Sequence, residues 1–325
     1  MARRDLIGTL RAAIAAAVMF LAGPILPVIG GLGMLLSPAP VLVYAAGESR
    51  MALRAALATV VAAGLIVVGG GPTTFGPAAA GIYLMTFGVA TVVMAAMLER
   101  RQSFEMIVLV ATVVILTAGA AALLATVGSP ATLADAMRTD LLNGMARGQK
   151  FYKAIGMQSG VPSETRAAIV DGTLRLAPAL AALSAATAAL LNLGVVWRYT
   201  GRERRIGYVL FGDLARWSAP EWLIWALVVA GFGLLFIPGA QLRLIALNLF
   251  VVVAAVYFCQ GLAIMSFYFK VLAMPALARG LIYFVTMVQP VLAALVCAVG
   301  VFDLWIDFRR LKPPSREARN LGDYL

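Results

Sequence analysis

The sequence contains no histidine and only two cysteines. It therefore lacks the commonest metal ligand and the commonest general base of enzymes. Cys259 and Cys297 both lie within apolar runs, which excludes a disulfide framework and a paired-cysteine metal site. No HExxH motif, serine–histidine pairing or Walker-type glycine loop is present either. We expect no catalytic residues, no metal, no cofactor and no enzymatic activity.

Charged residues are also scarce, at 13% of the chain, whereas an ordinary soluble domain has about a quarter. Hydrophobic residues make up 62%, and the mean hydropathy is +0.93. The apolar runs are too long and too numerous for the core helices of a soluble protein, and the short alternating segments of a membrane barrel are missing. The fold class is therefore all-α, a polytopic transmembrane helical bundle.

The charges that remain are mostly positive, with a formal net charge of +11. In so apolar a chain, Lys and Arg are expected in cytoplasmic loops rather than on a nucleic-acid surface. Arg3, Arg4 and Arg11 then keep the N-terminus in the cytoplasm, and the loop 198–205 carries the strongest cytoplasmic mark. We interpret the chain as a multi-pass protein of the bacterial inner (plasma) membrane. Its expected partner is the lipid bilayer, and we expect it to bind no nucleic acid.

We interpret residues 1–325 as a single integral membrane domain. Its N-terminal spans occupy 6–127, its C-terminal spans 163–310, and a basic cytoplasmic tail 311–325.

Counting apolar segments gives about eight or nine spans. Nine would place the basic tail outside, against the positive-inside rule. Two alternatives would remove this conflict. Either the run Arg243 to Lys270 bends at Gln260–Gly261, or the short segment Met34 to Ala46 crosses only halfway.

The segment 129–160 differs from the spans because it is amphipathic. Ser129 and Pro130 are a helix start signal. One arc of the predicted helix is apolar and comprises Leu133, Met137, Leu141, Met145, Tyr152 and Ile155. The other arc carries Asp135, Arg147, Lys150 and Lys153. Such a helix is expected to lie in the membrane surface, where it either packs passively on the bundle or covers an outward-facing pocket.

No carboxylate lies at the expected mid-depth of a span, which disfavours a proton- or sodium-coupled carrier. The polar residues of the C-terminal spans are instead neutral: Asn248, Tyr257, Gln260 and Gln289. They either form hydrogen bonds between helices or line an apolar cavity for an uncharged or zwitterionic ligand.

The run Gly280 to Phe302 is long enough for one span, with Trp305 at headgroup level. After it comes an interfacial charge cluster of Asp303, Asp307, Arg309 and Arg310. This cluster is either a functional clamp or a helix terminator.

Three motifs carry a resemblance to a known family: SPAP at 37–40, the pattern from Asn248 to Ala263 with its Q-G-L-A ending, and the closing G-V-F-D-L-W-I-D-F-R-R. In these the chain resembles the bacterial membrane family known as domain of unknown function 2232. That family is distantly similar to the S components of energy-coupling-factor vitamin transporters. In S components a small-residue A-x-x-x-A face of the first helix docks on a transmembrane coupling subunit; here Ala12 and Ala16, or Ala13 and Ala17, match it.

The leading hypothesis from the resemblance is a subunit that binds a small solute and works with a transmembrane coupling subunit and ATPases in trans. The alternative is a non-catalytic membrane scaffold or envelope assembly factor.

Overall fold

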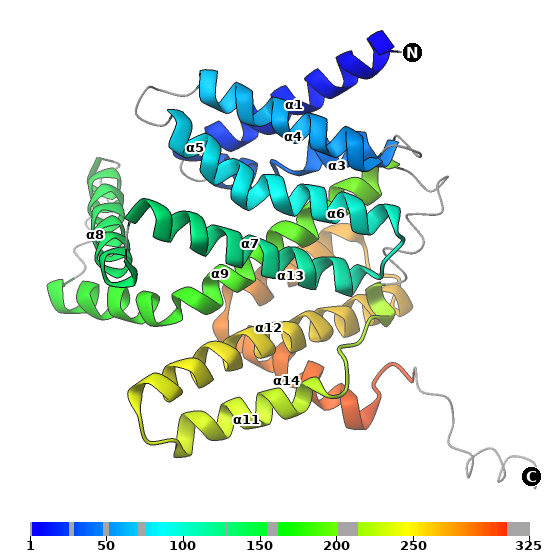
Figure 1. The fold of residues 1–325 in the computed structure, drawn as a ribbon. Helices are drawn as coiled ribbons and strands as arrows, with labels where there is room; N and C mark the ends of the chain where they lie inside the picture. Colours follow the sequence, from blue (N-terminus) through cyan, green and yellow to red (C-terminus); the bar gives the residue numbers. More distant parts are fainter. Residues whose placement is uncertain are drawn as a thin grey trace, which may run out of the picture. The chain divides into compact units, whose positions relative to one another are not determined.

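The computed structural model describes residues 2–25, 29–47, 52–70, 76–127, 129–154, 162–200 and 214–310. Every regular element in these ranges is helical, which confirms the all-α fold class. The chain divides into two compact units, Met1–Phe211 and Gly212–Leu325. Figure 1 shows their helices in sequence colours. The predicted tail 311–325 and Arg202, Arg204 and Arg205 of the basic loop lie outside the described residues.

The first part of the first unit is a group of apolar helices that share one hydrophobic core. Its elements are α1 (Ala2–Ile25), α2 (Ile29–Leu35), α3 (Ala39–Gly47), α4 (Ala52–Gly70), α5 (Gly76–Tyr83), the π-helical turn η1 (Leu84–Gly88), α6 (Val89–Glu99) and α7 (Phe104–Val127). The break between α2 and α3 falls at Ser37–Pro38, because a proline offers no N–H to a helical ladder.

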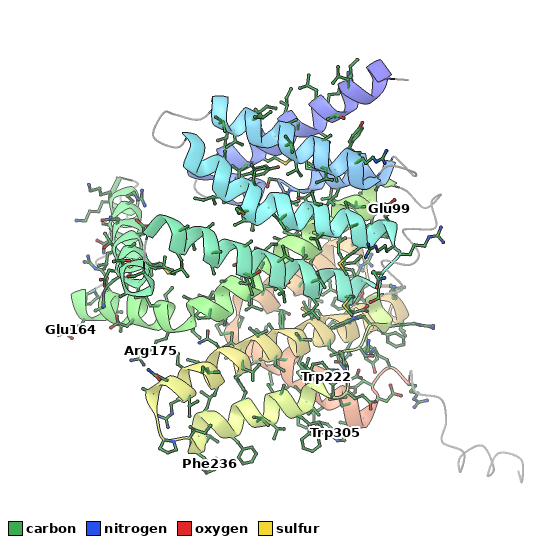
Figure 2. The ribbon with its side chains drawn as sticks, in the orientation of Figure 1. Glu99, Glu164, Arg175, Trp222, Phe236 and Trp305 are labelled. Atoms are coloured by element: carbon green, nitrogen blue, oxygen red, sulfur yellow. The ribbon has the colours of Figure 1, made fainter. Side chains whose placement is uncertain are left out.

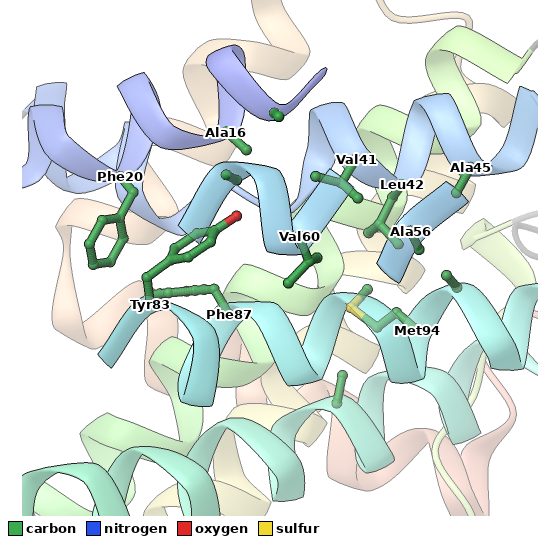
Figure 3. Packing of buried hydrophobic residues seen from close by; sticks show 14 of the residues in the cluster. Ala16, Phe20, Val41, Leu42, Ala45, Ala56, Val60, Tyr83, Phe87 and Met94 are labelled. Carbon is green, nitrogen blue, oxygen red and sulfur yellow. The ribbon is translucent and has the colours of Figure 1, made fainter. Parts of the chain in front are cut away.

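Small side chains let these helices approach closely. Ala13, Ala16 and Ala17 of α1 are fully buried, against α3 and α4. Phe20 fills the next layer, with its ring centroid 5.0 Å from that of Tyr83 in an edge-to-face arrangement (Figure 3). Close packing of this kind, rather than hydrophobicity, drives helix association in lipid.

The unit continues with α8 (Pro130–Ala154) and α9 (Ser163–Thr200). The predicted start of α8 is confirmed: the Thr132 N–H donates to Ser129 Oγ at 3.2 Å, as expected of an N-cap. Leu133, Leu141 and Met145 of the apolar arc are half-buried. Ile155 and the Tyr152 side chain lie outside the described residues. Asp171 of α9 pairs with Arg138 of α8 at 2.5 Å.

The second unit contains the 3₁₀ turn η2 (Leu214–Arg216), α11 (Leu223–Phe236), α12 (Ala240–Val271), α13 (Ala276–Val288) and α14 (Pro290–Ile306). Its principal contacts join α12 to α14 and α11 to α12. The side chains of Trp222, Phe236 and Trp305 point away from their helices (Figure 2) and are about two-thirds exposed. Exposed aromatic residues at span ends are typical of membrane proteins.

Five described helices are long and apolar enough to cross a membrane, and a sixth span results if the bent pair α13–α14 is counted as one. A multi-pass protein is thereby confirmed, but the expected eight or nine spans are not. The run Gly280 to Phe302, expected as one span, is bent by 102° at Gln289–Pro290. Of the two alternatives offered for the span count, the interruption at Gln260–Gly261 is not found, because α12 continues through these residues as one helix.

Candidate functional site

The most polar part of the described interior is a network around Asp303, in the last turn of α14. One carboxylate oxygen, Oδ2, accepts from Arg309 Nη2 at 2.6 Å and from Gln260 Nε2 at 3.1 Å. The other, Oδ1, accepts from the Phe308 N–H at 3.0 Å. Gln260, Asp303 and Arg309 are at most 6% exposed. Asp303 is therefore a carboxylate with both oxygens occupied by protein donors.

Arg309 reaches this site because the backbone reverses after α14. Asp307 has a φ of 46°, in the left-handed region that often ends helices, and Arg310 has 49°. The reversal brings Arg309 back against the segment before α11. There Arg309 Nη1 donates to the carbonyl oxygens of Ala215 and Trp217 at 2.9 and 2.8 Å. One guanidinium thus joins the end of α14 to a segment more than ninety residues earlier.

Gln260 completes the connection from α12. Its Oε1 accepts from the Ala219 N–H at 3.1 Å, while its Nε2 donates to Asp303. Both the oxygen and the nitrogen of the Gln260 side-chain amide are therefore hydrogen-bonded. A buried charge pair is tolerated when its remaining donors and acceptors find partners of this kind. The arrangement holds α12, α14 and residues 215–219 together, and it presents no free acid or base.

Two glycines bring α12 and α14 close enough for the network to form. A Cβ at Gly300 would lie 2.0 Å from the Tyr257 carbonyl oxygen, and one at Gly261 would lie 2.1 Å from the Val296 carbonyl oxygen. Both contacts are with backbone, which cannot rotate away. The Cys297 thiol donates to the Ala254 carbonyl oxygen at 3.2 Å in the same crossing. Only glycine permits this approach at positions 261 and 300.

Three polar atoms beside the network have no hydrogen-bond partner among the described residues: Trp217 Nε1, Tyr257 Oη and Arg309 Nε. Trp217 packs against a small apolar cluster that includes Tyr257. Each is a donor that is buried away from water, and such groups ordinarily bind something. They are the polar groups of this region that remain available to a ligand or an ordered water.

The four predicted ligand residues do not form one site. Tyr257 and Gln260 share the buried face of α12. Asn248 lies twelve residues earlier, about 18 Å along the helix, and its Nδ2 donates to the Leu244 carbonyl oxygen at 2.9 Å. Gln289 is exposed at the break between α13 and α14. The structure therefore brings together two of the four.

The charge cluster is divided in the same way. Of the four residues expected at the membrane interface, Asp303 and Arg309 are buried by other parts of the protein, Asp307 is half-buried and Arg310 is exposed. The pair belongs to the protein interior, and its burial depends on the segment 215–219.

The alanines of the predicted docking face are covered. Ala12, Ala13, Ala16 and Ala17 are at most 7% exposed. The exposed side of α1 is formed by Leu10, Ile14 and Val18, which are about half exposed.

A second polar position lies in the first unit at the break between α2 and α3. Asn192 of α9 is buried, and its Nδ2 donates to the Leu35 carbonyl oxygen at 2.8 Å and to the Ala188 carbonyl oxygen at 2.6 Å. The break frees the Leu35 carbonyl, and the amide satisfies it. Ser37 Oγ and Asn192 Oδ1 have no partner among the described residues. An isolated Asn in an apolar run is the sequence signal for this position.

No group of three or more metal-ligating side chains occurs in the part of the chain that the structure describes. Residues 13–304 match the model of a family described as "Predicted membrane protein (DUF2232)". No curated protein and no solved structure matches the chain.

Proposed function

The chain belongs to the DUF2232 family of predicted membrane proteins, and we propose that it is a small-solute-binding subunit of a transporter in the bacterial inner membrane. In this proposal the N-terminus is cytoplasmic, as the positive-inside rule requires. Three further apolar helices of 10–17 residues, Gly30–Ala46, Arg54–Gly69 and Leu223–Phe236, bring the proposed crossings to eight or nine.

The observation that carries the proposal is an interrupted apolar segment in each unit. One break lies at Ser37–Pro38 and the other at Gln289–Pro290. In lipid, a broken helix leaves backbone groups that need partners, so such breaks persist where they are covered by protein or line a cavity. Transporters build solute sites from helices of this kind. In the second unit the break carries the exposed amide of Gln289.

The solute class follows from the polar groups of the second unit. Asp303 and Arg309 neutralise each other at 2.6 Å, so they offer no net charge to a ligand. The other polar groups are the neutral side chains predicted from the sequence, Asn248, Tyr257, Gln260 and Gln289. An uncharged or zwitterionic solute suits neutral groups of this kind, and the exposed Gln289 is its first contact in this proposal.

A thermal-shift screen of the purified full chain against vitamins, nucleosides and lipids tests the proposal. A true ligand raises the melting temperature of the wild type, and Gln289→Ala reduces that rise. Gln241→Ala, a change of the same size at an exposed position at the start of α12, keeps it. If no compound in these classes stabilises the wild type, or if both variants respond alike, solute binding at the break is refuted.

The proposed partners are a transmembrane coupling subunit and ATPases in trans. Since the alanines of α1 are buried, docking through α1 would use its exposed side, with Ile14 at the centre. Ile14→Trp should then abolish co-purification with the coupling subunit, and Leu109→Trp on the exposed side of α7 should not. Retained co-purification with Ile14→Trp counts against docking on this face. Stable partners without any solute response favour the scaffold alternative.

A further inference from the structure

Helix α8 lies across the ends of two longer helices of the first unit. It contacts α7 and α9, and it crosses the C-terminal end of α7 and the N-terminal end of α9 (Figure 1). The candidate span of α7, Phe104–Ala125, has 22 residues. At 1.5 Å per residue it is about 33 Å long, close to the hydrocarbon thickness of a bilayer. A helix that begins five residues later, at Pro130, is therefore at headgroup level.

Contacts with the bundle fix which side of α8 faces outward. The half-buried Leu133, Leu141 and Met145 mark the inward side. Arg138 bonds Asp171 of α9, and both residues of this pair are about half exposed. The helix is thus held at its N-terminal half by an ion pair and along its length by an apolar face.

The C-terminal half of α8 carries three cations at three-residue spacing: Arg147, Lys150 and Lys153. All three are exposed, and no ion pair joins them to a described carboxylate. The acids of α8 are Asp135 and Asp140, in the other half, so residues 141–154 contain no carboxylate. On a helical wheel the three cations occupy an arc of about 120°, opposite the inward side.

We propose that Arg147, Lys150 and Lys153 bind the phosphate groups of anionic phospholipids at the membrane surface. The unpaired charges, their exposure and the depth set by α7 carry this assignment. Basic faces of amphipathic helices bind anionic membranes in this way, each Lys or Arg contributing about a fivefold preference near a charged surface. The lipid contact holds down the half of α8 that the Arg138–Asp171 pair does not reach.

Hydrogen exchange of the full chain in nanodiscs tests the proposal. We compare discs of phosphatidylcholine alone with discs that also contain phosphatidylglycerol. Amides 141–154 of the wild type should exchange about tenfold more slowly with phosphatidylglycerol present, a conservative fraction of the effect of three cations. The difference should vanish at about 1 M salt, where the Debye length is about 3 Å.

The triple variant R147Q/K150Q/K153Q should exchange at the same rate in both kinds of disc. A control variant, R54Q/R100Q/R243Q, removes the same charge at exposed positions on α4, at the end of α6 and on α12, and it should keep the difference. Equal exchange of the wild type in both discs overturns the proposal, as does a triple variant that behaves like the control. If the triple variant does not fold, the salt response of the wild type tests the proposal: a difference between the two kinds of disc that persists at about 1 M salt overturns it.

Discussion

Replacing Arg309 by Met tests whether the buried network holds the second unit together. The substitution keeps an apolar side chain of similar length and removes the guanidinium. Three hydrogen bonds disappear, to Asp303 Oδ2 and to the carbonyl oxygens of Ala215 and Trp217. It also leaves the Asp303 carboxylate without its cationic partner at a position that is 6% exposed. We expect a loss of about 3–5 kcal/mol in the free energy of unfolding, as for other broken buried ion pairs.

The chain supplies a matched control in Arg138→Met. Its ion pair with Asp171 is as short, 2.5 Å against 2.6 Å, but its side chains are 47% and 49% exposed rather than 1% and 5%. An exposed pair contributes about 0–1 kcal/mol. Because length and charge are alike in the two pairs, the difference between the variants measures the effect of burial.

The assay is denaturation of the purified chain in mixed micelles, followed by circular dichroism. The double variant D303N/R309M removes both charges and should be more stable than the sum of the two single losses predicts, by at least about 2 kcal/mol. Strictly additive losses, or equal losses for Arg309→Met and Arg138→Met, would refute the view that the pair is buried and coupled.

Four further substitutions examine the packing by the same assay. Gly300→Ala places a methyl group 2.0 Å from the Tyr257 carbonyl oxygen and should cost about 3 kcal/mol or more, whereas Gly280→Ala, with no atom within 4 Å, should gain up to about 1 kcal/mol from helix propensity. Ala16→Leu, at a fully buried position of α1, should cost about 1–3 kcal/mol by overpacking; an unchanged stability would contradict the burial of that face. Tyr257→Phe removes a buried hydroxyl without a partner and should leave stability unchanged or raise it by about 1 kcal/mol, so a marked loss would mean that the hydroxyl is bonded.

The sequence predicts the helices well because their signals are local. Ser129 begins α8, as its hydroxyl and the following proline indicate. Leu133, Leu141 and Met145 of its predicted apolar arc are half-buried, whereas Met137 is exposed. Periodicity and caps depend on neighbours within one or two turns, so they can be read without knowledge of the fold.

The position of the helix break in the second unit could not be predicted from neighbouring residue types alone. Gln260–Gly261 and Gln289–Pro290 look alike as polar residues followed by a helix-breaking one, but only the second is broken. Gly261 keeps its N–H and fits a crossing that only glycine allows. Pro290 has no N–H and disfavours a helical conformation at Gln289, whose ψ is 108°. Proline is therefore the stronger signal, and glycine here marks close contact.

The buried network could not be derived from the sequence. Asp303 and Arg309 look interfacial because they follow an apolar run and adjoin Arg310. Their burial depends on carbonyl oxygens of Ala215 and Trp217, which are 94 and 92 residues away in sequence. Backbone acceptors leave no mark in residue types, so only the tertiary structure reveals them.

The same contacts indicate which part of the second unit moves if a solute binds there. Helices α12 and α14 touch backbone to backbone at Gly300 and are joined by the Asp303 network, so sliding between them would break both at once. Among the described residues, the principal helix contact of α13 is with α14, and one ring contact, Phe269 with Tyr283 at 5.3 Å, joins it to α12. Its break at Gln289 is already outside helical geometry. Closure over a solute is therefore expected as a swing of α13 about Gln289, against a fixed α12–α14 pair.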